Sequence, residues 1–197
     1  MKKTNLKLTI KLISSFLLLQ FAFLSATAQI KYQAKNDFNL LVSGTSTLHD
    51  WDMKSAKGEC KAMIAFNDSG LLTSISDLTF VSPAQGLKSG HEGMDLNAYK
   101  ALKTDKFKNI NFILSAAKVN SDGTINGIGK LTIAGVTHDA ELIVTYKINH
   151  DKSVSISGSK KINLFYYNMQ PSVFMGGLFK IGDEINVKFD LTLFKTN

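Results

Sequence analysis

The sequence of 197 residues contains no arginine, so all 23 of its basic residues are lysine. The planar guanidinium group of arginine is the side chain that proteins favour for bidentate hydrogen bonds to phosphates and base edges, and this chain lacks it. Four lysines precede residue 12 and no acidic residue precedes Asp37, so residues 29–197 carry 19 lysines against 16 acidic residues. The resulting net charge of +3, well below the +7 of the whole chain, removes most of the case for a nucleic-acid partner.

Cysteine and proline are scarce. Cys60 is the single cysteine and cannot form an internal disulfide. It alternates in phase with apolar residues of 62–66, which predicts a small buried side chain and not a reactive thiol. Pro83 and Pro171 are expected between strands. No nucleophile elbow, phosphate-binding loop or zinc-protease motif occurs, so the sequence gives no positive argument for an enzyme.

Residues 1–28 have the three parts of a secretory signal peptide. Lysines between Lys2 and Lys11 precede an apolar run, Leu12–Leu24, and the small-x-small pattern Ala26-Thr27-Ala28. We expect cleavage after Ala28, export to the periplasm, and one domain over residues 29–197. A retained membrane anchor is disfavoured because the run is shorter than the roughly 20 residues of a span. No cysteine stands at the cut, so a lipoprotein is not expected.

From residue 29 onward the hydrophobic pattern has a period of two. Residues 185–193 alternate apolar and polar side chains, which is typical of a strand with one dry face. The pattern predicts an all-β, mainly antiparallel domain, with about eight strands in a sandwich or a closed barrel. The expected strands are 38–46, 59–66, 75–81, 110–118, 124–133, 140–148, 153–165 and 185–193.

Residues 94–103 break this pattern and predict a short helix. Asp95 is the expected N-cap, and Leu96, Tyr99 and Leu102 fall on one face. Such a helix typically covers an open end or edge of a sheet. In strand 124–133, Gly127 and Gly129 are both expected to point inward, which indicates either an empty interior or a bend at a barrel corner.

Several segments together resemble the YceI-like polyisoprenoid-binding family. Residues 129–142 (GKLTIAGVTHDAEL) are similar to the family's hallmark G-x-L-T-i-x-G-v-T-k-x-v-x-L, and residues 181–187, 106–112 and 43–51 resemble three weaker motifs. Leu164 and Asn168 stand where the family has arginine and glycine. The resemblance implies an exported, eight-stranded, lipocalin-like barrel with one short helix near its mouth. It also implies a non-catalytic protein that stores or transports a long-chain isoprenoid or similar amphiphile.

The apolar connection 169–181 is expected to be a flap over the barrel mouth, with a satellite core as the alternative. We expect no cofactor and no metal; an isoprenoid lipid or a quinone is the expected ligand. Nucleic acid is not an expected partner, and transient membrane contact is allowed. The candidate ligand-binding residues are Trp51, Phe66, Leu96, Tyr99, Leu102, Phe112, Gly127, Gly129, Leu131, Tyr146, Phe174, Met175 and Phe179.

Two other interpretations remain open. Three His-Asp pairs occur, and an exported metal protein or enzyme would centre on His49, Asp50 and His91. Adjacent strand residues point to opposite faces, so solvated or turn-forming roles are favoured for these pairs. An outer-membrane barrel would also show period-two alternation, and periodicity does not tell which face is inward.

Overall fold

The computed structural model describes residues 29–170, 173–174 and 179–196, without the side chains of residues 35–37, 173, 174 and 179. The expected signal peptide and its cleavage after Ala28 lie outside the described residues. In the described part of the chain, no helix is long and apolar enough to cross a membrane.

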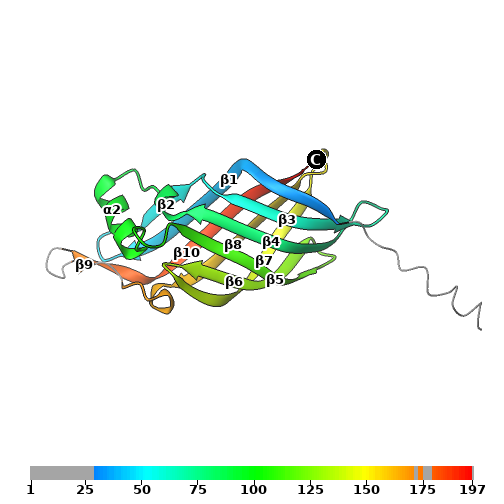
Figure 1. Ribbon diagram of the computed structural model, residues 1–197. Helices are drawn as coiled ribbons and strands as arrows, with labels where there is room; N and C mark the ends of the chain where they lie inside the picture. Colours follow the sequence, from blue (N-terminus) through cyan, green and yellow to red (C-terminus); the bar gives the residue numbers. More distant parts are fainter. Residues whose placement is uncertain (1–28, 171–172, 175–178, 197) are drawn as a thin grey trace, which may run out of the picture.

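Eight antiparallel strands form a closed barrel (Figure 1). Each strand pairs with the next in the series, and β1 also pairs with β10 over positions between Tyr32 and Ser46, which closes the sheet. The predicted eight-stranded antiparallel barrel is therefore confirmed. The strands in order are β1 (Ile30–Ser46), β3 (Glu59–Phe66), β4 (Leu72–Pro83), β5 (Asn109–Val119), β6 (Thr124–Ile133), β7 (Val136–Ile148), β8 (Val154–Asn163) and β10 (Phe179–Lys195).

One edge of β1 is shared by two short partners. Its first residues, Ile30–Gln33, pair with β3, and Leu40–Gly44 pairs with β2 (Trp51–Ser55). β2 and β3 thus act as one strand interrupted at residues 56–58. The sequence pattern missed β2 because five residues are too few to establish a period. It also placed Pro83 between strands, whereas Pro83 ends β4.

Turn residues set the connections between strands. In the β5–β6 turn, the carboxylate of Asp122 accepts hydrogen bonds from the backbone N–H (3.0 Å) and hydroxyl (2.6 Å) of Thr124. The β6–β7 turn holds both Ala134 (φ 49°) and Gly135 (φ 81°) in the left-handed region. Two such residues between paired strands match the right-handed twist of a hairpin.

The two ends of the barrel differ. At one end the interior is filled by fully buried side chains that include Tyr32, Ile64, Val154 and Leu193. At the other end lie helix α2 (Glu92–Ala101) and the short strand β9 (Val173–Phe174), which pairs with the start of β10 (Figure 1). Short 3-10 turns, η2 (Ala84–Gly86) and η3 (Leu164–Tyr167), follow β4 and β8.

Helix α2 forms near the predicted position, but its start was predicted wrongly. The N-cap is His91, which makes no side-chain capping bond, and Asp95 lies within the first turn. Asp95 is buried and accepts hydrogen bonds from the backbone N–H (2.7 Å) and hydroxyl (2.8 Å) of Ser89. Lys88 adds an ion pair at 3.4 Å. Asp95 therefore ties the preceding loop to the helix, a role that spacing alone does not distinguish from a cap.

Candidate ligand-binding cavity

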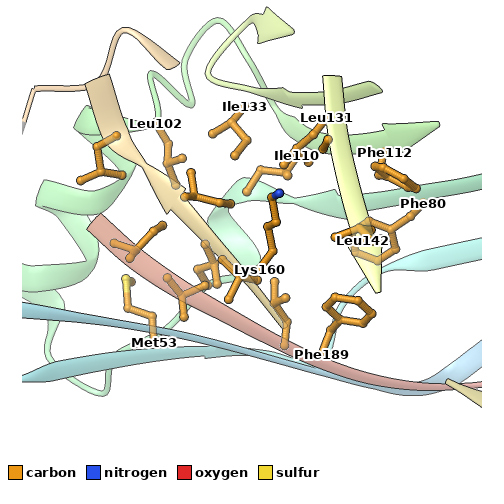
Figure 2. A pocket seen from close by; sticks show the side chains of 18 of the residues that line it. Met53, Phe80, Leu102, Ile110, Phe112, Leu131, Ile133, Leu142, Lys160 and Phe189 are labelled. Carbon is orange, nitrogen blue, oxygen red and sulfur yellow. The ribbon is translucent and has the colours of Figure 1, made fainter. Parts of the chain in front are cut away.

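A cavity of about 540 Å³ occupies the barrel interior on the α2 side. Its walls are inward-facing side chains of the strands, and Met94, Ala98, Ala101 and Leu102 bring α2 and the residue after it to its surface. Figure 2 shows apolar side chains from several strands converging on this space. A volume of this size lies in the range of cavities that enclose small organic ligands.

Five of the predicted ligand-binding residues line this cavity: Trp51, Leu102, Phe112, Gly127 and Leu131. Trp51 is fixed at the rim, where its indole N–H donates to the Thr45 carbonyl at 3.1 Å. Gly44 permits this position, because a Cβ there would lie 2.6 Å from Trp51 Cε2. The backbone thus approaches the Trp51 ring closely.

Of the three residues predicted on the inward face of the helix, Leu102 lines the cavity and the other two do not. Leu96 is 60% exposed and does not line the cavity. Tyr99 turns to the loop, where its hydroxyl donates to the carbonyls of Gln85 (3.1 Å) and Leu87 (2.9 Å). The inward face of α2 is formed by Met94, Ala98 and Ala101, while Asp95 is held against Ser89 in the preceding loop.

Gly129 does not provide empty space. An added Cβ would lie 2.5 Å from Phe112 Cζ and would overlap the Ile113 carbonyl oxygen. The ring of Phe112 therefore fills the position that Gly129 leaves free. At Gly127, by contrast, a Cβ would meet only Leu114 Cδ1 at 3.1 Å among close neighbours. Of the two inward glycines, only Gly127 lines the cavity.

The remaining predicted residues lie elsewhere. Phe66 and Tyr146 pack against the main core without lining the cavity. Phe174 and Phe179 are paired in the β9–β10 hairpin, but their side chains lie outside the described part of the chain, as does all of Met175. The flap hypothesis therefore remains a prediction for these three residues. Its flanks do reach the cavity, through Met169, Gln170, Lys180 and Ile181.

Cys60 is buried as predicted and is 1% exposed. Burial raises the pKa of its thiol to about 12, so the thiol stays protonated at neutral pH. Cys60 also lines the cavity, together with residues that the sequence analysis did not select. The largest omission is Lys160, which lies in the same inward phase of β8 as Ile156 and Ile162. The alternation along β8 contained this information.

A second, more polar pocket lies outside the barrel rim. His49, Asp50 and His91 all border it, along with Asp52, Lys161 and Glu184. The turn before β2 is held by the Ser46 hydroxyl, which accepts from the His49 backbone N–H at 3.2 Å, and not by an aspartate as the sequence favoured. Within the described residues, no group of three or more His, Cys, Asp or Glu side chains could hold a metal ion.

Comparisons with known proteins agree on the fold. The family model described as the YceI-like domain matches residues 25–193. The structure is similar to BcnA of Burkholderia cenocepacia, with a TM-score of 0.65 and 16% identity over 79% of this chain and 95% of that one. Comparison with curated protein sequences found no match.

Two further solved structures are similar. A Campylobacter jejuni YceI protein has a TM-score of 0.55 and 18% identity, over 69% of this chain and 80% of that one. A polyisoprenoid binding domain from Saccharophagus degradans, implicated in plant cell wall breakdown, has a TM-score of 0.64 and 10% identity, over 86% of this chain and all of that one. At these identities the likeness shows the barrel fold.

Proposed function

This chain belongs to the YceI-like domain family, and from that premise we propose that it binds a long-chain isoprenoid or a similar amphiphile in the barrel. The observation that carries the proposal is the cavity of about 540 Å³, whose walls are almost wholly aliphatic and aromatic. Transfer of each methylene from water to such walls contributes about 0.8 kcal/mol. The similarity to a polyisoprenoid binding domain from Saccharophagus degradans supports the same ligand class.

The proposed role is storage or transport of the lipid, without catalysis. The signal peptide predicted for residues 1–28 supports a periplasmic location. The single cysteine of the chain is not an activated nucleophile, since burial keeps the thiol of Cys60 protonated.

Organic extraction of the purified protein, followed by mass spectrometry, tests the proposal. We expect a stoichiometric amphiphile from the unaltered chain. Ala117→Phe should reduce the recovered lipid several-fold, because Ala117 lines the cavity and the larger side chain would occupy it. Ala116→Phe adds the same bulk at the neighbouring exposed position and should leave recovery unchanged. Equal recovery from both variants, or a folded protein without lipid, would contradict a ligand in the barrel.

A further inference from the structure

A lysine lies among the inward-facing residues of β8, in a largely apolar part of the barrel wall. On β8 the inward positions are Val154, Ile156, Gly158, Lys160 and Ile162. Lys160 lines the cavity, and in Figure 2 its side chain stands among apolar side chains and carries the nitrogen drawn in blue. Its cross-strand partner on β10 is Val187, another cavity residue. The ammonium group therefore extends from an apolar surface of the lumen.

The ammonium group of Lys160 has only a neutral partner in the structure. Nζ donates to the backbone carbonyl oxygen of Glu141 at 3.0 Å, where β7 and β8 have separated beyond the pair Val144–Gly158. Lys160 takes part in none of the ion pairs formed among the described residues. A lysine ammonium has three N–H donors, and the bond to Glu141 uses one of them. The positive charge of Lys160 has no carboxylate partner among the described residues.

The cavity supplies no counter-charge of its own. Its charged lining residues, among those the structure describes, are Lys160 and Lys180, and no aspartate or glutamate lines it. Lys180 is exposed near the start of β10, whereas Lys160 is half-buried. A charge beside an apolar surface is costly unless it is paired, so an anionic ligand group would be stabilised there.

We propose that Lys160 binds the acidic group of the ligand, and that this ligand is a long-chain monocarboxylic acid. This inference rests on the proposed function, because it assigns the polar end of the same bound amphiphile. One ammonium balances one carboxylate, and Lys160 is the half-buried ammonium of the cavity. A phosphate with a charge near −2 would need a second cation, and the other lining lysine, Lys180, lies exposed at the start of β10.

Binding of matched fluorescent probes to the lipid-free chain tests this assignment. The probes are an 18-carbon polyene fatty acid, the corresponding alcohol and the corresponding phosphate monoester. We expect the acid to bind at least about tenfold more tightly than the alcohol, equivalent to about 1.4 kcal/mol. Lys160→Met should abolish this preference by weakening the acid, while the Kd of the alcohol stays within about twofold.

Lys188→Met is the matched control for loss of a positive charge. Lys188 is exposed on the outer face of β10, opposite Ser159, and lines neither cavity. The Lys188→Met variant should keep the full preference for the acid over the alcohol. Lys160→Gln removes the charge while retaining a hydrogen-bond donor, and it should also lose the preference for the acid. This variant replaces Lys160→Met if that variant does not fold.

Each contrary outcome has a distinct meaning. Equal affinity of the unaltered chain for acid and alcohol, or a preference that survives in Lys160→Met or Lys160→Gln, would overturn the role of Lys160. That result would leave Lys160 as a structural link to Glu141. Tighter binding of the phosphate than of the acid would overturn the monocarboxylate assignment. Failure of all three probes to bind would contradict the proposed function itself.

Discussion

Gly129 shows how one residue's environment decides its role. In the sequence it is the second of two inward glycines, and nothing distinguishes it from Gly127. In the structure, the Phe112 ring lies where the Cβ of any other residue would stand, while Gly127 faces the cavity. The absence of a side chain at Gly129 is therefore used for packing, and at Gly127 it leaves room in the lumen.

This difference predicts unequal responses to the same substitution. Gly129→Ala should lower the free energy of unfolding by about 1–3 kcal/mol, the usual cost of overpacking a core. Gly127→Ala should cost less, because the contact is with the flexible end of Leu114. Urea unfolding of both variants would measure the difference. Equal destabilisation would mean that the Phe112 ring and the Ile113 carbonyl accommodate the added methyl group as easily as Leu114 does.

At the scale of the elements, helix α2 is attached to the end of the barrel by the loop that precedes it. Its inward face is apolar, and its attachment is polar: Ser89 donates to Asp95, and Lys88 pairs with the same carboxylate. The hydrogen bonds from Ser89, and then the charge of Lys88, lower the pKa of Asp95 from 3.8. The ionised form of Asp95 is thus the one that stabilises the fold.

We therefore predict that Asp95→Asn lowers the Tm at pH 7 and speeds hydrogen exchange in α2. Because the pKa in the folded state is lowered, this contribution is complete above pH 3.8 and is lost as the pH falls through the folded value. The Tm of the two proteins should converge in that acidic range. Asp122→Asn is a control in a distant turn and should leave exchange in α2 unchanged. A constant Tm difference down to pH 2 would contradict a charge effect.

At the scale of the whole molecule, the barrel divides into a filled half and a hollow half. Tyr32, Val154 and Leu193 pack the filled half, and the hollow half holds the cavity, where the proposed ligand would make the equivalent contacts. Native-state binding stabilises a protein by RT ln(1 + [L]/Kd), about 2.7 kcal/mol at one hundred times Kd.

Removal of the lipid should therefore lower the Tm, and addition of a long-chain amphiphile should restore it in a concentration-dependent way. Ala117→Phe, whose side chain would occupy the lumen, should respond much less to the added amphiphile. Differential scanning calorimetry of the lipid-free and reloaded proteins would measure both effects. An unchanged Tm on lipid removal would mean that the hollow half needs no occupant.

The sequence alone determined the strand content and the two alternating faces of most strands, because alternation reports those faces directly. Which of the two faces points inward followed from the family likeness and not from the alternation. The sequence also determined the buried state of Cys60, and the segment 129–142 carried the family likeness. Which strands bound the lumen, and where the lumen is filled, depended on contacts between segments far apart in the chain.

The tertiary structure alone decided the details of the site. The start of α2 depends on Ser89 and Asp95, the use of Gly129 depends on Phe112, and the exposure of Leu96 depends on how the helix meets the barrel. For Lys160, the sequence indicates the face of β8 on which the side chain lies, but it does not indicate that the described cavity lining contains no carboxylate. These are relations across the closed barrel, and they exist only once β1 has met β10.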